Sequence, residues 1–181
     1  MKPQNVTDTE PKLNSMENDQ IAHLAGVFDA VGGARINVVK DSDYRLDYML
    51  QPMLRLQRPN EDDPLLGKLM AYCDEYSVRY SITESSHGRD RDSTSIRWVV
   101  IHPDSVERFL EPMMGYLVTN YIRAELMLTE ALPAIRDDEY LTKRGFYELM
   151  GVADKMREGT SPQSKPKYTQ EYFGDLWSLG E

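Results

Sequence analysis

Residues 24–32 read Leu24-Ala25-Gly26-Val27-Phe28-Asp29-Ala30-Val31-Gly32. Apolar residues recur here at helical spacing and predict a helix over residues 20–31 with one apolar face, formed by Ile21, Leu24, Val27 or Phe28, and Val31. The same helix carries small residues a turn or less apart, at Ala22, Ala25, Gly26 and Ala30. Such a stripe lets two helix backbones approach closely, so it predicts a tight helix crossing. Gly32 and Gly33 should then end the helix, in the left-handed conformation that glycine tolerates.

This segment resembles the nine-residue motif of the LAGLIDADG homing endonucleases, with six of nine positions identical and two conservative. In that family, two such helices pack at the centre of the molecule, from two copies of a chain or from two halves of a longer one. The acid at the eighth motif position binds the divalent metals that cut DNA. Here that position is Val31, and valine offers no oxygen to a hard cation such as Mg²⁺. The resemblance therefore implies a retained helix crossing without the cleavage chemistry.

Asp29, at the sixth motif position, is the nearest acid to Val31. It lies about 200° around the helix from Val31, so it cannot simply replace the missing metal ligand. Aspartate near a helix end commonly accepts a local hydrogen bond, and we expect this role for Asp29. It is kept as a weak catalytic candidate.

The composition indicates one acidic domain. The chain has 181 residues, a net charge of −9 and 8 Lys against 13 Arg, which fits a high-salt, archaeal-type cytoplasm. The single cysteine, Cys73, excludes an internal disulfide and is expected in the core. No apolar run reaches the roughly 18 residues of a membrane span, so a cytoplasmic location is expected. The three histidines are too scattered to predict a zinc site, and no cofactor is expected.

Four segments alternate between apolar and polar residues and predict strands at residues 34–40, 44–58, 78–83 and 95–101. Pro52 within the second should mark a bend, a bulge or an edge. Helices are predicted over residues 65–76, from about Pro103 with Asp104 or Ser105 as the cap, over 117–135 with a break at Pro133, and over 142–157. An aromatic segment at 168–177 should dock back onto the domain.

The order helix, two strands, helix, two strands, then helices is that of the family: an α+β unit, αββαββα, whose antiparallel, saddle-shaped sheet lies on DNA. We therefore expect a tail at residues 1–19, the family-like domain at 20–135 and a helical extension at 136–181. Only one copy of the motif is present, which implies a homodimer. The predicted dimer interface consists of Ala22, Ala25, Gly26 and Ala30.

The strand residues opposite the apolar ones should form an exposed nucleic-acid-binding face. Arginine pairs with guanine, Asn and Gln pair with adenine, and a β-ribbon fits the major groove. The candidates are Arg35, Asn37, Gln51, Arg55, Gln57, Arg79, Ser81 and Arg97. The charge distribution permits this, since residues 32–102 carry 10 basic and 11 acidic side chains, against 11 and 19 elsewhere.

These observations predict a sequence-specific binder of duplex DNA, acting as a homodimer without cleavage. One alternative is an active, Mg²⁺-dependent endonuclease or nickase, of the kind linked to intron or intein mobility, that uses Asp29 or a partner subunit. The other is a structural dimer with no nucleic-acid role.

Overall fold

The computed structural model describes residues 16–58, 63–86, 94–158 and 166–179. Its first part is an αββαββ unit, as predicted: α1 (Asn18–Val31), β1 (Gly32–Lys40), β2 (Tyr48–Arg58), α2 (Pro64–Glu75), β3 (Ser81–Ser86) and β4 (Thr94–Val100). The strands form one antiparallel sheet in the order β1-β2-β4-β3. Most of the predicted tail, residues 1–15, lies outside the described residues.

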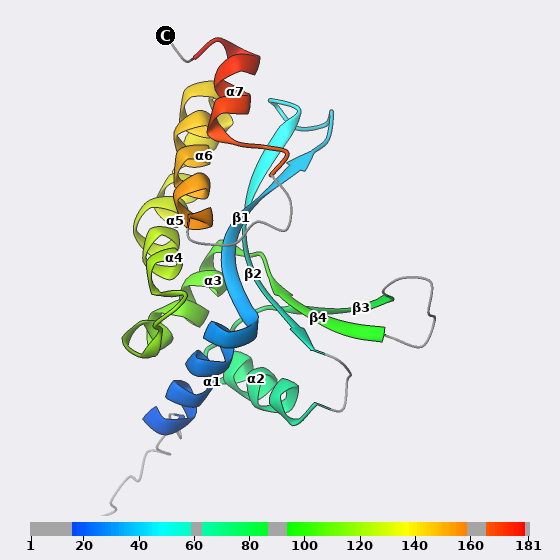
Figure 1. The fold of residues 1–181 in the computed structure, drawn as a ribbon, viewed down its shortest axis with the longest axis vertical. Coiled ribbons are helices and arrows are strands. Elements are labelled where there is room, and N and C mark those ends of the chain that lie inside the picture. Colours follow the sequence, from blue (N-terminus) through cyan, green and yellow to red (C-terminus); the bar gives the residue numbers. More distant parts are fainter. Residues whose placement is uncertain (1–15, 59–62, 87–93, 159–165, 180–181) are drawn as a thin grey trace, which may run out of the picture.

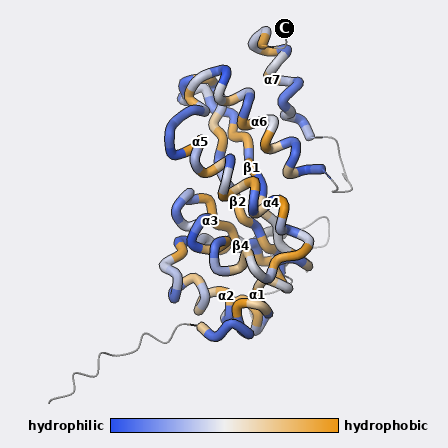
Figure 2. The backbone as a smooth tube through the Cα atoms, turned by 90° about the vertical axis from the view of Figure 1, so that its left-hand side faces the viewer, coloured by the Kyte–Doolittle hydropathy of each residue, from blue (hydrophilic) through white to orange (hydrophobic). Residues whose placement is uncertain are grey.

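The remaining helices cover one face of this sheet. They are α3 (Pro103–Leu110), α4 (Tyr121–Leu126), α5 (Leu132–Arg136), α6 (Lys143–Arg157) and α7 (Gln170–Trp177). Seen from the helical side, α3 to α6 lie in front of β1, β2 and β4 (Figure 2). In Figure 1, α1 and α2 lie at one end of the molecule, and α6 and α7 flank the far end of the long β1–β2 hairpin. Among the described helices, none has the length and apolar character needed to cross a membrane.

The core lies between the sheet and the helices. Leu54, Leu56, Trp98 and Val100 of β2 and β4 are fully or almost fully buried, as the alternation predicts. The ring of Phe109 in α3 lies 5.3 Å from that of Phe28 in α1 and 5.0 Å from that of Trp98. Cys73 is also buried, as expected, and burial raises the pKa of its thiol to about 12.

Gly32 ends α1 for a different reason from the predicted one. Its φ of −109° and ψ of −175° are extended, so no left-handed conformation is involved. A Cβ at this position would instead lie 2.5 Å from Cδ2 of Phe28. Glycine is therefore required by the close approach of the Phe28 ring to the backbone at the junction of α1 and β1.

We expect Gly32→Ala to lower the free energy of unfolding by about 1–3 kcal/mol, because the new methyl overpacks against a buried ring. Urea denaturation of the purified protein measures this. Gly26→Ala is the matched control, because an added Cβ there meets nothing within 4 Å. Equal stabilities of the two variants would contradict the proposed reason for Gly32.

β1 begins two residues before its predicted start and β4 is shifted by one residue, whereas β2 and β3 differ more. β2 begins at Tyr48 rather than residue 44, because residues 41–47 form the turn, in which Asp43 N donates to Asp41 Oδ1 and Asp47 has a φ of 60°. β3 spans Ser81–Ser86 rather than 78–83. β3 is an edge strand, and its Ile82 is 39% exposed. The alternation of apolar and polar residues therefore does not predict which side chains of this strand are buried.

The two prolines within predicted elements are accommodated locally. Pro52 pairs with Ile36 of β1, whereas the ladder between β2 and β4 begins only at Leu54. Pro52 therefore lies on a stretch of β2 with an open edge, one of the three predicted possibilities. The helix predicted over residues 117–135 begins only at Tyr121, and it is not broken at Pro133. A π-helical turn, Met127–Ala131, joins α4 directly to α5, whose first turn contains Pro133.

Helices α6 and α7 begin within two residues of the predicted positions, whereas the N-cap of α3 differs from the prediction. Thr142 and Thr169 cap α6 and α7 through their side chains. At α3, however, the N-cap is His102, without a side-chain bond, rather than Asp104 or Ser105. Ser105 is buried and its hydroxyl accepts a hydrogen bond from the backbone N–H of Arg79.

The aromatic segment docks onto the β1–β2 hairpin, as expected. The ring of Tyr48, at the start of β2, lies 5.1 Å from Phe173, 5.6 Å from Tyr168, and 6.4 Å from both Phe146 and Trp177. Its hydroxyl is 3.2 Å from that of Tyr172. The end of the chain therefore supports the far half of this hairpin.

Candidate nucleic-acid interface

The sheet face turned away from the helices is polar and continuous. Cross-strand partners share a face, and the register joins Arg35 to Met53, Asn37 to Gln51, Gly33 to Arg55, Gln57 to Arg97 and Arg97 to Thr83. We call this the outer face. Its described residues are Gly33, Arg35, Asn37, Val39, Met49, Gln51, Met53, Arg55, Gln57, Ser81, Thr83, Ser95, Arg97 and Val99.

No described side chain of the outer face is acidic, although the chain as a whole carries a net charge of −9. Asp47, which alternation assigns to the same face, lies instead in the turn before β2. Of the predicted binding residues, Arg35, Asn37, Gln51, Arg55, Gln57, Ser81 and Arg97 all lie on β-strands of this face. Arg79 lies two residues before β3, outside the strands. The fold therefore separates the outer face from the acidic remainder.

The arginines of the outer face have no carboxylate partner among the described residues. Arg35 Nη2 lies 3.2 Å from Met53 Sδ, and Arg55 Nη2 donates to Gln57 Oε1 at 2.8 Å. Within the described residues, the buried Nε of Arg97 has no hydrogen-bond acceptor. A buried donor without an acceptor is unfavourable, and a ligand oxygen would satisfy it.

The positive charges also act on one another. Desolvation lowers the pKa of Arg35, and repulsion from Arg55, Arg97 and Arg157 lowers it further. Desolvation and repulsion from Arg97 likewise lower the pKa of Arg55. Arg35 and Arg55 remain charged at neutral pH, since the pKa of an arginine lies far above it. The unbalanced repulsion would be relieved by a bound anion.

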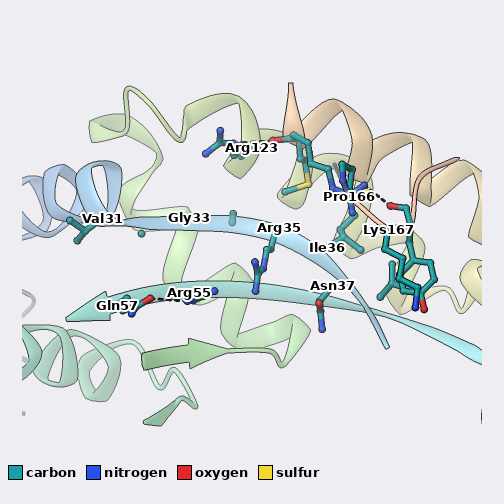
Figure 3. A pocket seen from close by; sticks show the side chains of 16 residues that line it. Val31, Gly33, Arg35, Ile36, Asn37, Arg55, Gln57, Arg123, Pro166 and Lys167 are labelled. Atoms are coloured by element: carbon teal, nitrogen blue, oxygen red, sulfur yellow. Dashed lines mark hydrogen bonds between the residues drawn. The ribbon is translucent and has the colours of Figure 1, made fainter. Parts of the chain in front are cut away.

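A groove of about 580 Å³ runs along β1. The outer-face residues Arg35, Arg55 and Gln57 line it, together with Arg123 of α4 and Lys167, which precedes α7. Figure 3 shows Arg35 and Arg123 on opposite sides of β1, with Lys167 on the side of Arg123, close to Ile36. Within the described residues, no acidic side chain lines this groove. Arg123, Arg157 and Lys167 were not among the sequence candidates, because isolated basic residues outside the strands are usually solvated.

Asp29 accepts hydrogen bonds, as expected, but from a loop distant in sequence rather than from its own helix end. Its Oδ2 accepts a hydrogen bond from Val118 N at 2.6 Å, and its Oδ1 accepts one from Asn120 N at 2.7 Å. The buried side chain of Asn120 donates to Phe28 O and accepts from Arg123 Nη1. Both oxygens of Asp29 are thus used to join α1 to the start of α4.

Val31 lies at the end of α1 and is 43% exposed. It lines the groove, where the resembled motif would place a metal-binding acid. Across the described ranges, no group of three or more His, Cys, Asp or Glu side chains is arranged to hold a metal ion. The end of α1 therefore presents an apolar side chain beside the arginines.

The small-residue stripe of α1 divides between the core and the surface. Ala25 is completely buried in the chain's own core, so it is not available to a second chain and its assignment to the dimer interface is wrong. Gly26 and Ala30 are exposed and Ala22 is partly exposed. These three line a shallow, mainly apolar groove with Val27, Val31 and Leu65, which His23 and Arg58 also line. We call Ala22, Gly26 and Ala30 the α1 surface.

Comparison with known proteins identifies the fold. No protein-family model matches the sequence, and no curated protein matches it. Among solved structures, the homing endonuclease I-CvuI in complex with its target has a TM-score of 0.70 and 21% identity, over 91% of this chain and 96% of that one. The archaeal intron-encoded homing endonuclease I-Vdi141I, complexed with DNA, has a TM-score of 0.69 and 16% identity, over 91% and 100%.

A third solved structure is longer than this chain. The LAGLIDADG meganuclease I-CpaMI, bound to uncleaved DNA, has a TM-score of 0.65 and 22% identity, and the match covers 91% of this chain and 50% of that one. The chain thus corresponds to the whole of two of these proteins and to half of the third. Together with the motif in α1 and the αββαββ order, these matches show that the chain has the LAGLIDADG homing endonuclease fold.

Proposed function

We propose that this chain is a sequence-specific duplex DNA-binding protein that acts as a homodimer and does not hydrolyse DNA. The observation that carries the proposal is the outer face: three arginines without carboxylate partners and no described acidic side chain, in a chain of net charge −9. The structural neighbours I-CvuI and I-Vdi141I, which were solved with DNA, have the same fold.

The side chains of the outer face suit the major groove of B-form DNA. Arg55 and Arg97 are of the type that reads guanine, and Asn37 and Gln51 are of the type that reads adenine. They lie on paired antiparallel strands, and a two-stranded ribbon has the width that this groove admits. An RNA duplex is disfavoured because its major groove is too deep and narrow for side chains to read.

The homodimer is supported by α1. The α1 surface is free of bulky or charged side chains, and an added Cβ at Gly26 would meet no atom of the same chain within 4 Å. A second α1 could therefore approach closely. The chain is also half the length of I-CpaMI, so two copies would match one such protein.

Absence of cleavage is supported by two residues. Val31 offers no metal ligand at the end of α1, and both carboxylate oxygens of Asp29 already accept backbone hydrogen bonds. The endonuclease alternative would therefore need an acid from a different subunit. We propose that the homodimer alone binds its site and leaves it intact.

Selection from a random duplex library, with and without Mg²⁺, tests these proposals together. We expect enrichment of a pseudo-palindromic site, because a twofold dimer reads two related half-sites, and recovery of that site uncut in both conditions. Enrichment of cut ends in Mg²⁺ would overturn the absence of cleavage. No enrichment of any duplex would favour the structural dimer, and preferential binding of a matched single-stranded RNA library would shift the ligand to RNA.

We expect Arg55→Ala and Arg97→Ala each to weaken binding to the selected site by about 1–3 kcal/mol and to relax specificity at one base pair. Arg144→Ala is the matched control, because Arg144 is an exposed arginine of α6 that pairs with Glu148 and does not line the groove. Fluorescence anisotropy at fixed salt measures the affinities. Equal affinity of all three variants and the wild type would remove the outer face from the interface.

A further inference from the structure

The groove along β1 has a second basic wall that is not part of the sheet. Arg123 comes from α4, Arg157 from the last turn of α6, and Lys167 from the segment before α7. These three residues are far apart in sequence, but all of them line the groove along β1, an edge strand of the sheet. Figure 3 shows Arg123 and Lys167 on the other side of β1 from Arg35 and Arg55. The helical extension therefore adds positive charge beside the outer face.

This wall is held in place by backbone hydrogen bonds. Arg123 Nε donates to the carbonyl of Met156 at 2.9 Å, which fixes α4 against the end of α6. Arg157 Nη1 donates to the carbonyl of Tyr168 at 3.0 Å and to Asp154 Oδ1 at 2.5 Å, which fixes the segment that carries Lys167. Arg123 and Arg157 are thus partly committed to structure.

Lys167 has a different environment. Its side chain is exposed, lines the groove and has its Nζ 5.0 Å from the ring centroid of Tyr168. The described ion pairs do not include it. Lys167 is therefore the member of the wall that can most readily reach a ligand.

We propose that this groove is a phosphate-binding site, in which the second basic wall holds the backbone of the nucleic acid whose bases face the sheet. The inference rests on the proposed DNA binding and assigns a second part of the interface to it. The two parts share Arg35, Arg55 and Gln57, so one continuous polyanion can occupy both. Lysine acts on phosphate as a point charge and carries no base information. The C-terminal helices thus contribute affinity, and the outer face contributes specificity.

The test uses Lys167→Gln in the full chain, with Lys143→Gln as the matched control. Both lysines are exposed, and Lys143 lies at the opposite end of α6, outside the groove. Affinity for the selected duplex and for a scrambled duplex is measured between 50 and 300 mM KCl, a range of about sixfold in salt that resolves single phosphate contacts.

We expect Lys167→Gln to weaken binding to both duplexes by a similar factor, about threefold to tenfold, and to reduce the slope of log affinity against log salt by about 1. Lys143→Gln should leave both unchanged. Arg157 is not used as the test residue, because its loss would also release Tyr168.

Failure of the phosphate assignment and failure of the proposed DNA binding give different results. If the wild type binds the selected duplex and Lys167→Gln binds it with the same affinity and salt slope, the groove is not a phosphate site and DNA binding by the outer face still stands. If Lys167→Gln weakens only the selected duplex, Lys167 reads sequence and the phosphate assignment is overturned. If the wild type binds no duplex at any salt concentration, the proposed function fails and the groove assignment fails with it.

Discussion

Asp29→Ala is expected to lower the free energy of unfolding by about 3 kcal/mol or more. The carboxylate accepts two short hydrogen bonds, from Val118 N and Asn120 N, and hydrogen bonds to a charged group contribute about 1.5–3 kcal/mol each. Alanine would leave the N–H of Asn120 without its acceptor, in a residue that is itself buried. Urea denaturation followed by circular dichroism measures the loss.

Asp29→Asn and Asp19→Ala provide the comparison. Asparagine keeps one oxygen acceptor, so its loss should be intermediate, and Asp19 lies exposed in the first turn of α1, where its removal should cost less than about 1 kcal/mol. The endonuclease alternative makes the opposite prediction. If Asp29→Asn folded as stably as the wild type and abolished a Mg²⁺-dependent nicking activity, Asp29 would be catalytic and its structural role would be secondary.

Gly26→Leu is expected to convert the proposed homodimer into a monomer. A leucine side chain on the α1 surface would hold two helices apart, because close packing there depends on the absence of side-chain atoms. Sedimentation should show a change from twice 20.9 kDa to 20.9 kDa. Duplex affinity should fall with it, because a monomer contacts only one half-site.

The monomer itself should remain folded. Position 26 is exposed and open to at least 4 Å, and leucine favours a helix over glycine by about 0.8–1 kcal/mol. Gly67→Leu is the matched control, since Gly67 is also an exposed helical glycine with nothing within 4 Å of an added Cβ. A dimer that survives Gly26→Leu, or one that dissociates equally with Gly67→Leu, would remove α1 from the interface.

The fold was predictable because its local patterns are strong. The nine-residue motif identifies α1, and the regular alternation in β1 and β2 gives the correct outer-face residues, from Arg35 to Gln57. The helix predicted from about Pro103 is α3, and its Val106, Phe109 and Leu110 lie in the core. Each of these signals comes from residues close together in sequence.

The errors come from contacts distant in sequence. The two backbone N–H groups that donate to Asp29 belong to Val118 and Asn120, about 90 residues away, and no local pattern predicts them. The burial of Ala25 depends on helices beyond α1, so the stripe of small residues could not be divided into core and surface. β3 was misplaced because its edge position leaves both faces exposed and removes the contrast on which alternation depends.

The second basic wall illustrates the same limit. Arg123, Arg157 and Lys167 belong to three segments, and each looks like an ordinary solvated charge within its own segment. Only the packing of the helical extension against β1 brings them together with Arg35. A basic site built in this way has no signature at any spacing in the sequence.

The packing of Tyr48 against Phe146, Phe173 and Trp177 has a consequence for biosynthesis. Ribosomes add roughly 5–20 residues per second from the N-terminus, so the hairpin that carries Asn37 and Gln51 emerges well before the segment that supports its far end. The far half of the β1–β2 hairpin therefore gains its aromatic support only after α7 has been synthesised. A nascent chain that ends before α7 would lack this support for Asn37 and Gln51.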